Sequence, residues 1–263
     1  MTHSPDESRT ARGSFRWWAF AALSVVGMSI VTVYLLVPID FGTRTPGLRT
    51  ICTNNMRSVG GALLVYPDSH QGKLPPAFVA DINGKPINSW RVMLFRQLDR
   101  PELAATYDLT GPWDGPKNQK LATGSLDDLL FHCPSSSERP TGKTNYLVVT
   151  GPGTLFPGGK QVSLKDVKDG LDNTILLVEV ADSDIFWTEP RDLTLDEALQ
   201  GINASIHGKA GKGRSISSYH PGGAYVMFAD GRLRFLPEDI SPALLKALLT
   251  IDGGEDLRAL GWK

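Results

Sequence analysis

The chain has 263 residues, of which 41% are hydrophobic and 21% are charged, and its formal net charge is −1. This balance is typical of a globular protein without polyelectrolyte character, so it argues against nucleic acid as a partner. About 220 residues remain after a short N-terminal tail and an anchor, which is enough for one large domain or two small ones.

The first expected element is an unbroken apolar run at residues 17–37, bounded by Arg16 and Asp40. About 21 residues make a helix of about 31 Å, which matches the hydrocarbon thickness of a bilayer. A cleaved secretory signal has a shorter apolar core that ends in small residues, whereas this run ends in Leu36-Val37-Pro38-Ile39. We therefore predict a retained, single transmembrane helix with the lipid bilayer as its partner.

The charges on the two sides of this run are nearly balanced. Arginines precede and follow it: Arg9, Arg12 and Arg16 on one side, and Arg44, Arg49 and Arg57 on the other. Arg16 abuts the apolar core directly, whereas Asp40 is the first charge on the far side. By the positive-inside rule we expect residues 1–16 to form a cytoplasmic tail and the body of the chain to be exported.

After the run, Pro38, Gly42, Pro46 and Gly47 predict a short elbow at residues 38–47. Apolar residues then recur at spacings of three and four, which is the stripe of an amphipathic helix: Leu48, Cys52, Met56, Val59, Leu63 and Tyr66. Pro67 ends this pattern. We expect this spine helix to pack on a sheet that the later chain supplies.

Runs of β-branched or aromatic residues predict strands at residues 129–132, 145–150, 174–180, 224–229 and 232–236. Short helical segments are expected at residues 90–98, after Pro101, at residues 195–200 behind a Thr194/Glu197 capping box, and at residues 242–249 behind the N-cap Ser241. One apolar-striped helix followed by an antiparallel-rich sheet makes the expected fold class α+β. Residues 48–263 form the expected body.

Asp230-Gly231 lies between the last two predicted strands and is a strong signal for a β-hairpin. A type I′ turn at these residues needs a positive φ at both, and it would pair Phe228 with Leu233 and Val226 with Phe235. These four side chains would then share an apolar face of the hairpin, while the arginines between them point the other way.

Several blocks of the body are similar to blocks of one bacterial family. They are Cys52-Thr53-Asn54-Asn55-Met56-Arg57-Ser58-Val59-Gly60, Gly72-Lys73-Leu74-Pro75-Pro76, Ser89-Trp90-Arg91-Val92, Pro112-Trp113-Asp114-Gly115-Pro116, Cys133-Pro134-Ser135, Thr144-Asn145-Tyr146, Gly151-Pro152-Gly153-Thr154, Asp169-Gly170 and Trp187-Thr188-Glu189-Pro190. The most specific block runs from His220-Pro221-Gly222-Gly223 to Asp230-Gly231, with nine residues between the histidine and the aspartate.

In this order, over about residues 36–255, the blocks resemble the prepilin-like H-x9-DG family, a group of unknown function that also carries a solute-binding-protein label. The resemblance implies a type IV pilin-like fold, with an N-terminal membrane helix that runs into a spine helix wrapped by a sheet. With the charge bias around residues 17–37, we expect a single-pass protein of the bacterial inner membrane, with its N-terminus cytoplasmic and its body periplasmic.

The chain departs from this family at its N-terminus. Members usually open with a Gly-Phe prepilin junction and a glutamate at the fifth mature position, whereas this chain has Gly13-Ser14-Phe15-Arg16-Trp17-Trp18 and no glutamate in the apolar run. We interpret it as a permanently anchored relative with an unprocessed N-terminus.

No catalytic residue, metal site or cofactor is predicted, because the common zinc, redox and hydrolase motifs are absent. Residues 208–215 resemble a phosphate-binding loop but carry Arg214 where the lysine belongs, so a basic surface loop is the preferred interpretation. Asp166, Asp169 and Asp172 lack the spacing of a calcium loop and are expected to serve turns and caps. His70 and His132 stand alone.

His220 and Asp230 invite a catalytic interpretation, but the predicted strand between them separates them by about 20 Å. An acid–base pair must approach to about 3 Å. We therefore predict that Asp230 and Gly231 are turn residues and that His220, with Pro221, Gly222 and Gly223, fixes the loop before the hairpin.

Two classes of function stay open. The first is a pilin-like envelope protein that acts through contacts with other envelope proteins. The second is a membrane-tethered binding module for a small solute or glycan, with a concave site lined by Trp113, Trp187 and Tyr219. If the body is exported, we expect a disulfide between Cys52 of the spine helix and Cys133 after the strand at residues 129–132.

Overall fold

The computed structural model describes residues 24, 27–28, 44–124, 128–136, 142–204 and 214–262. In this part of the chain the spine is helix α2, Arg44–Val65, which the 3₁₀ turn Tyr66–Ser69 continues. The predicted apolar stripe is confirmed, because Cys52, Met56, Val59, Leu63 and Tyr66 are all buried. The helix begins four residues before its predicted start, so residues 44–47 are helical and do not belong to an elbow. Pro46 fits because the N–H groups of a first helical turn need no partner inside the helix.

The predicted membrane run at residues 17–37 lies outside the described residues, apart from Ser24, Gly27 and Met28. In the part of the chain that the structure describes, no helix is both long enough and apolar enough to cross a bilayer. The predicted basic loop lies outside the described residues up to residue 213.

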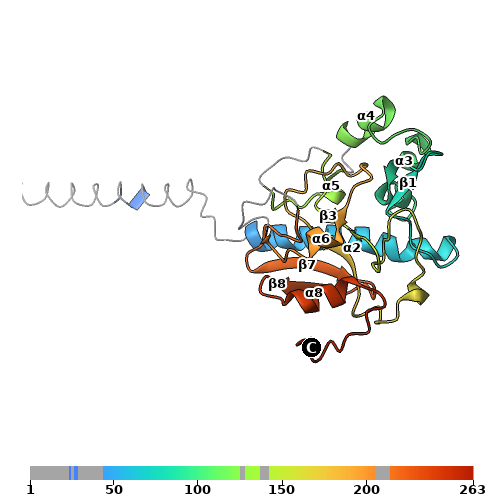
Figure 1. Cartoon of the computed structure of the whole chain (residues 1–263). Coiled ribbons are helices and arrows are strands. Elements are labelled where there is room, and N and C mark those ends of the chain that lie inside the picture. The colour runs from blue at the N-terminus through green and yellow to red at the C-terminus, as the bar shows by residue number, and fades with distance from the viewer. Residues whose placement is uncertain are drawn as a thin grey trace, which may run out of the picture. The chain divides into compact units, whose positions relative to one another are not determined.

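A four-stranded antiparallel sheet lies between α2 and the C-terminal helix α8, Pro242–Leu249, within the compact unit Thr45–Lys263 (Figure 1). Its strand order is β3-β5-β7-β8, with bounds Tyr146–Leu147, Ile175–Glu179, Gly223–Phe228 and Leu233–Pro237. Leu177 and Met227 pack toward α2, while Val178 and Val226 join the core under α8. The expected α+β class is therefore confirmed.

Close packing between the spine and the sheet depends on Gly60 of α2. A Cβ atom there would lie 2.1 Å from the sulfur of Met227 on β7. A side chain at position 60 would therefore require the buried Met227 thioether to move.

Smaller elements complete the body. The additional strands are β1 Phe78–Ala80 with β2 Pro86–Ser89, and the parallel pair β4 Val149–Thr150 with β6 Leu193–Thr194. The additional helices are the 3₁₀ turn Trp90–Leu94, α3 Pro101–Thr106, α4 Pro116–Gly124, α5 Asp128–Phe131, the 3₁₀ turn Leu164–Asp166 and α6 Leu195–Ala198. The capping box of α6 and the N-cap Ser241 of α8 are both present as predicted.

The predicted strand at residues 129–132 is wrong, because this segment is helix α5. An apolar run of three residues fits one helical turn as well as a strand, so its pattern alone does not separate the two. The Phe131 ring stacks on the Trp187 ring with 5.5 Å between centroids, and its carbonyl accepts the amide of Asn145. These contacts hold the segment as a turn against the core.

The hairpin β7–β8 forms at the predicted place but in a register shifted by one residue. Met227 pairs with Leu233, and Tyr225 pairs with Phe235. Within the loop 229–231 only Gly231 has a positive φ, +85°, which excludes a type I′ turn. The loop therefore has three residues, with the glycine in the left-handed region.

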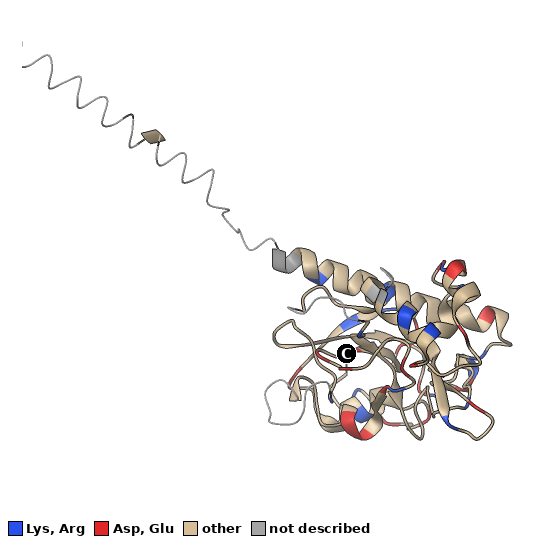
Figure 2. Ribbon diagram, turned by 90° about the horizontal axis from the view of Figure 1, so that it is seen from above, with Lys and Arg blue, Asp and Glu red and all other residues tan. Residues whose placement is uncertain are grey.

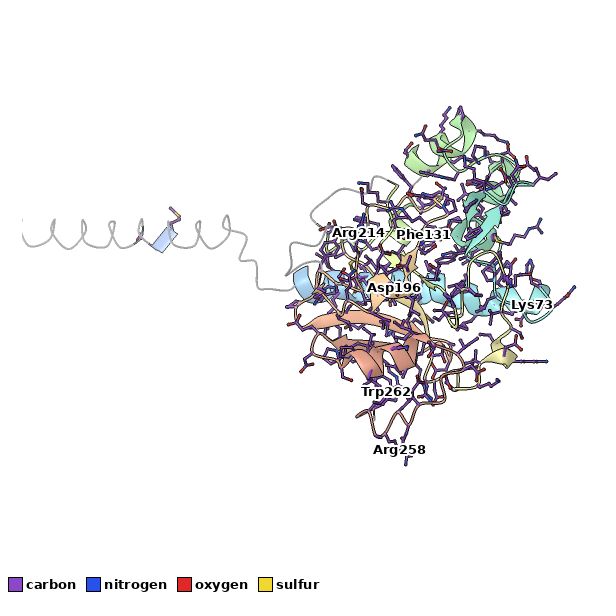
Figure 3. All side chains as sticks on the ribbon, in the orientation of Figure 1. Lys73, Phe131, Asp196, Arg214, Arg258 and Trp262 are labelled. Carbon is purple, nitrogen blue, oxygen red and sulfur yellow. A yellow bond between two sulfur atoms is a disulfide. The ribbon has the colours of Figure 1, made fainter. Side chains whose placement is uncertain are left out.

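This shift exchanges the two faces of β8. Phe235 and Leu233 now lie on the α2 side, whereas Arg234 places its guanidinium 5.0 Å from the Phe228 ring and 4.9 Å from the Trp262 ring. Trp262 lies near α8 (Figure 3). The predicted common apolar face of the hairpin is therefore wrong, since a one-residue slip moves every side chain of a strand to the other face.

Gly231→Val is expected to lower the free energy of unfolding by about 1–3 kcal/mol, because a β-branched residue at positive φ is strained. Asp230→Asn is expected to change it little, because the amide oxygen can replace the carboxylate oxygen that accepts the Arg232 amide at 2.9 Å. Urea unfolding of both variants measures the difference. Equal stability of Gly231→Val and the wild type would contradict the turn assignment.

Candidate functional site

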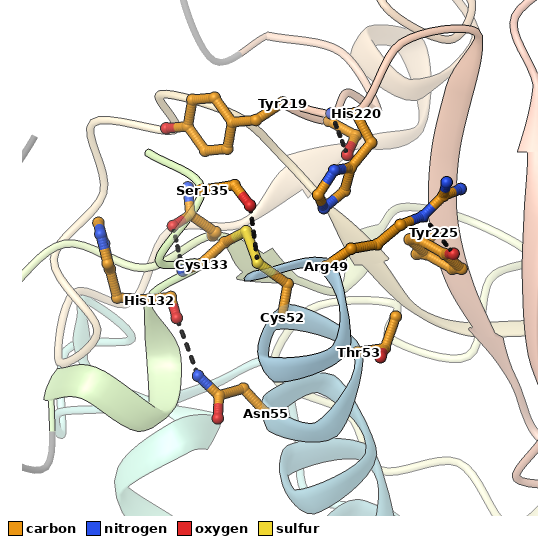
Figure 4. The surroundings of a disulfide bond; sticks show 12 residues. Arg49, Cys52, Thr53, Asn55, His132, Cys133, Ser135, Tyr219, His220 and Tyr225 are labelled. Carbon is orange, nitrogen blue, oxygen red and sulfur yellow. Dashed lines mark hydrogen bonds between the residues drawn. A yellow bond between two sulfur atoms is a disulfide. The ribbon is translucent and has the colours of Figure 1, made fainter. Parts of the chain in front are cut away.

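A disulfide joins the spine helix to the segment after α5 (Figure 4). Cys52 and Cys133 are bonded, their Cα atoms are 4.8 Å apart, and the residues are 2% and 0% exposed. This is the pairing predicted from the sequence. Cys133, however, follows a helix and not a strand.

Asn145, just before β3, and Tyr146, its first residue, hold the backbone on both sides of this disulfide. The Asn145 side chain accepts the Cys133 amide at 2.8 Å and donates to the Val180 carbonyl at 3.0 Å. The Tyr146 hydroxyl donates to the Cys52 carbonyl at 2.9 Å. The family-like block Thr144-Asn145-Tyr146 therefore has a structural role, which is to fix both cysteines against the sheet.

His220 lies beside the disulfide. One of its ring nitrogens is within 4.8 Å of both cysteine sulfurs, and the residue is 3% exposed. Its ring also meets the Tyr225 ring edge-on, with 6.2 Å between centroids. Burial lowers the pKa of the imidazole, and the positive charge of Arg49 lowers it further. His220 is thus neutral at neutral pH, and its Nε2 is buried without a hydrogen-bond partner.

Arg49, in the first half of α2, borders the polar cluster formed by the disulfide, His220 and Tyr225. Its Nε donates to the Tyr225 hydroxyl at 2.7 Å, and its guanidinium lies 5.1 Å from the Tyr225 ring centroid and 4.9 Å from that of Phe235. These contacts place a cation at the edge of a buried polar cluster, where cation–π attraction stabilises it.

Glu179 is the buried acid of the same region. It ends β5, pairs across the sheet with Tyr146, and is 1% exposed. Burial raises its pKa to about 7, although Ser218, Tyr225 and Arg49 each lower it. Neither carboxyl oxygen has a hydrogen-bond partner of good geometry, although the Ser218 hydroxyl and the Tyr225 amide are near enough to lower the pKa. Sequence reasoning missed this residue.

The free energy of unfolding is expected to fall as the pH rises from 4.5 to about 7, because the folded state holds the Glu179 proton more tightly than the unfolded chain, whose pKa is near 4.5. The full difference is on the order of 3 kcal/mol. Glu179→Gln removes this part of the pH dependence, and Glu102→Gln, an exposed control on α3, keeps it. Urea unfolding at pH 5 and pH 8 measures both. A wild-type slope that survives in Glu179→Gln would assign the proton elsewhere.

The structure does not bring His220 and Asp230 together. Asp230 lies at the hairpin tip, where its carboxylate accepts the Arg232 amide at 2.9 Å, whereas His220 lies beside the disulfide. Two glycines between them are required by the local backbone geometry. Gly222 has φ +87°, and a Cβ on Gly223 would lie 2.1 Å from the Leu236 carbonyl oxygen.

The predicted aromatic site needs correction. Trp187 is 0% exposed, its ring stacks on Phe131, and its indole N–H donates to the Ala122 carbonyl at 3.1 Å, so it is a core residue that no solute reaches. Trp113 is half-buried against Phe186. The Tyr219 hydroxyl donates to Asp182 at 2.9 Å.

A cleft of about 510 Å³ opens elsewhere on the body, and none of the predicted aromatics lines it. Its walls include Ala77, Phe78, Gly151, Arg191, Asp192 and Asp196. Sequence reasoning missed this cleft. The family-like block at residues 151–154 is the signal that points to it.

A buried ion pair underlies one wall of the cleft. Arg91 and Asp192 are bonded, and their side chains are 0% and 1% exposed. The Asp192 carboxylate also accepts the Trp90 indole N–H at 3.1 Å and the Val148 amide at 3.0 Å. Arg91 donates to the Tyr146 carbonyl at 3.1 Å. Burial raises the pKa of Asp192, and Arg91 opposes that rise.

Acidic and basic residues are nearly equal in number, 28 and 27 in the whole chain. In Figure 2, the positions of both kinds are scattered along the ribbon of the body.

The structure thus defines an α+β body with a disulfide-centred polar cluster beneath a spine helix. The family model described as "Protein of unknown function (DUF1559)", which also carries a solute-binding-protein label, matches residues 49–205. The chain belongs to this family. No curated protein and no solved structure matches the chain.

Proposed function

We propose that the protein is a membrane-anchored envelope protein of pilin-like architecture whose exported body acts through contacts with other envelope proteins. The observation that carries this proposal is the spine helix α2. It follows the apolar run at residues 17–37 in sequence and buries one face against an antiparallel sheet, while Ile51 and Val65 on its other face are exposed.

Two further features support the proposal of an exported body that contacts other envelope proteins and is anchored in the bacterial inner membrane. The Cys52–Cys133 disulfide belongs to an oxidising compartment, because cytosolic thiols are kept reduced. The net charge of −1 suits protein contacts more than nucleic acid.

The anchor is tested by the double variant Val26→Arg and Ile30→Arg, with Val26→Leu and Ile30→Leu as its control. Each arginine near the centre of a bilayer helix costs about 2.5–3.5 kcal/mol, so the arginine variant should leave the membrane fraction on carbonate extraction, and the leucine variant should stay. Retention of both would contradict the anchor. Export is tested by adding protease to intact spheroplasts. Degradation of the body with protection of the N-terminal tail would support export, and protection of the body would contradict it.

The contact surface is tested by a photo-crosslinking residue at position 51, on the open face of α2, with position 82 as control. Ile51 and Ile82 are both exposed, and Ile82 lies in the turn between β1 and β2. A discrete crosslinked envelope protein at position 51 that is missing at position 82 supports the proposal. Identical products at both positions would reject α2 as the contact surface.

The cleft favours a second candidate, a tethered binding module for a small solute or glycan. Its lining includes one aromatic ring, Phe78, as well as Arg191 and Asp196, so it offers an apolar face and charges of both signs. A thermal-shift screen of sugars and amino acids tests this candidate. A ligand that raises the Tm of the wild type but not of Phe78→Ala would place binding in the cleft.

A further inference from the structure

Three potential metal-ligating atoms meet at the disulfide. The sulfurs of Cys52 and Cys133 and a ring nitrogen of His220 all lie within 4.8 Å of one another. The three residues come from α2, from the segment after α5 and from the segment before β7. Figure 4 shows the His220 ring near the two sulfurs, whereas the His132 ring points away from them.

His220 gives an independent sign that this cluster binds something. Its Nε2 is buried and has no hydrogen-bond partner, although a buried polar atom without a partner costs free energy. The backbone of the residue is held in place, because its amide donates to the Ser218 hydroxyl at 3.1 Å. The imidazole is thus fixed, neutral and available as a ligand.

We propose that reduction of the Cys52–Cys133 disulfide converts this cluster into a site for one thiophilic divalent cation of the zinc type, with Cys52, Cys133 and His220 as its protein ligands. Two thiolates and one neutral imidazole are ligands that zinc prefers over oxygen-binding ions such as Mg²⁺ or Ca²⁺. The Ser135 hydroxyl lies 3.5 Å from the Cys52 sulfur and borders the fourth position.

The geometry allows the conversion. Zinc–sulfur bonds of about 2.3 Å and zinc–nitrogen bonds of about 2.0 Å in a tetrahedron require the ligand atoms to be roughly 3.5–3.8 Å apart. Breaking the S–S bond lets the sulfurs separate by side-chain rotation, and the histidine nitrogen, within 4.8 Å already, needs to approach by about 1.3 Å or less.

Reduction adds two electrons and two protons to the disulfide, and a dithiol donor that supplies them becomes a disulfide itself. Binding of the cation then releases two protons, because the ligands are thiolates. The positive charge of Arg49 near the cluster favours this deprotonation. The disulfide and the metal exclude each other, so the oxidation state of the cysteines decides whether the site exists.

The test uses the full chain, reduced by a trialkylphosphine, which takes oxygen from water to become a phosphine oxide while the hydrogens of that water protonate the two sulfurs. Zn²⁺ is titrated against a chromophoric chelator. We expect one Zn²⁺ per reduced chain, with about two protons released, and Co²⁺ in its place should give thiolate charge-transfer bands. His220→Asn should weaken binding at least about tenfold. His70→Asn, a control at the far end of the spine, should not.

Two results would overturn the proposal: equal Zn²⁺ affinity of the reduced wild type and reduced His220→Asn, or equal affinity of the oxidised and reduced wild type. If the reduced chain unfolds without metal, Zn²⁺-induced recovery of its circular dichroism replaces the titration. The wild type should then recover and His220→Asn should not, because metal binding and folding are coupled. Equal recovery of both would likewise reject His220 as a ligand.

Discussion

Arg91→Met lowers the free energy of unfolding by about 3–5 kcal/mol, because it leaves the Asp192 carboxylate buried without its cation. The carboxylate keeps the N–H groups of Trp90 and Val148, but these neutral donors do not balance a full charge at a side chain that is 1% exposed. Urea unfolding measures the loss. A second consequence is local, because Arg91 also donates to the Tyr146 carbonyl on β3.

A partly exposed ion pair provides the matched control. Arg191 contacts Glu189, and its side chain is 53% exposed, so Arg191→Met should cost less than about 1 kcal/mol. The double variant Arg91→Met with Asp192→Asn should recover part of the loss, since it removes the uncompensated charge and keeps an oxygen for the Trp90 and Val148 donors. Equal losses of unfolding free energy in Arg91→Met and Arg191→Met would show that burial of the ion pair does not raise the cost of removing its cation.

Replacing both cysteines by alanine lowers the free energy of unfolding by up to about 4.5 kcal/mol. The bond closes a loop with a sequence separation of 81 residues, and the cost follows from the larger freedom of the unfolded chain when that loop is open. Alanine suits the test because both positions are buried. Urea unfolding of the oxidised wild type and the double variant measures the difference.

The state of the cysteines in cells is measured separately. Protein denatured directly from cells in the presence of an alkylating reagent should show no free thiol if the body is exported and oxidised. Two alkylated thiols would contradict the prediction of a disulfide in cells. The stability measurement would be unaffected by that outcome, because it uses purified, oxidised protein.

Elements that depend on neighbours in the sequence were predictable. The buried stripe of α2, the capping box at Thr194 and the N-cap Ser241 each follow from residues three or four apart. The position of the last hairpin follows from Asp230-Gly231 for the same reason. These features rest on local hydrogen bonds and on helical periodicity, which the order of residues determines by itself.

Short apolar segments and registers were not predictable to the residue. Helix α5 was expected as a strand, because three apolar residues carry no periodicity. The register of β7 and β8 was wrong by one, because the choice between a two-residue and a three-residue loop depends on which side chains the two faces of the sheet must bury. Phe235 lies on the α2 side, where the guanidinium of Arg49 covers its ring.

The candidate site also has features that were predictable from the sequence and features that only the tertiary structure decides. Cys52, Cys133 and His220 lie in three separate sequence blocks, and a disulfide between the two cysteines is expected from the sequence if the body is exported. That His220 lies beside this disulfide was decided by the tertiary structure, since the sheet must bring β7 next to the first half of α2. Arg91 and Asp192, 101 residues apart, carry no local signal either. Local rules act over a few residues, whereas the pairing of buried polar groups depends on how the whole chain packs.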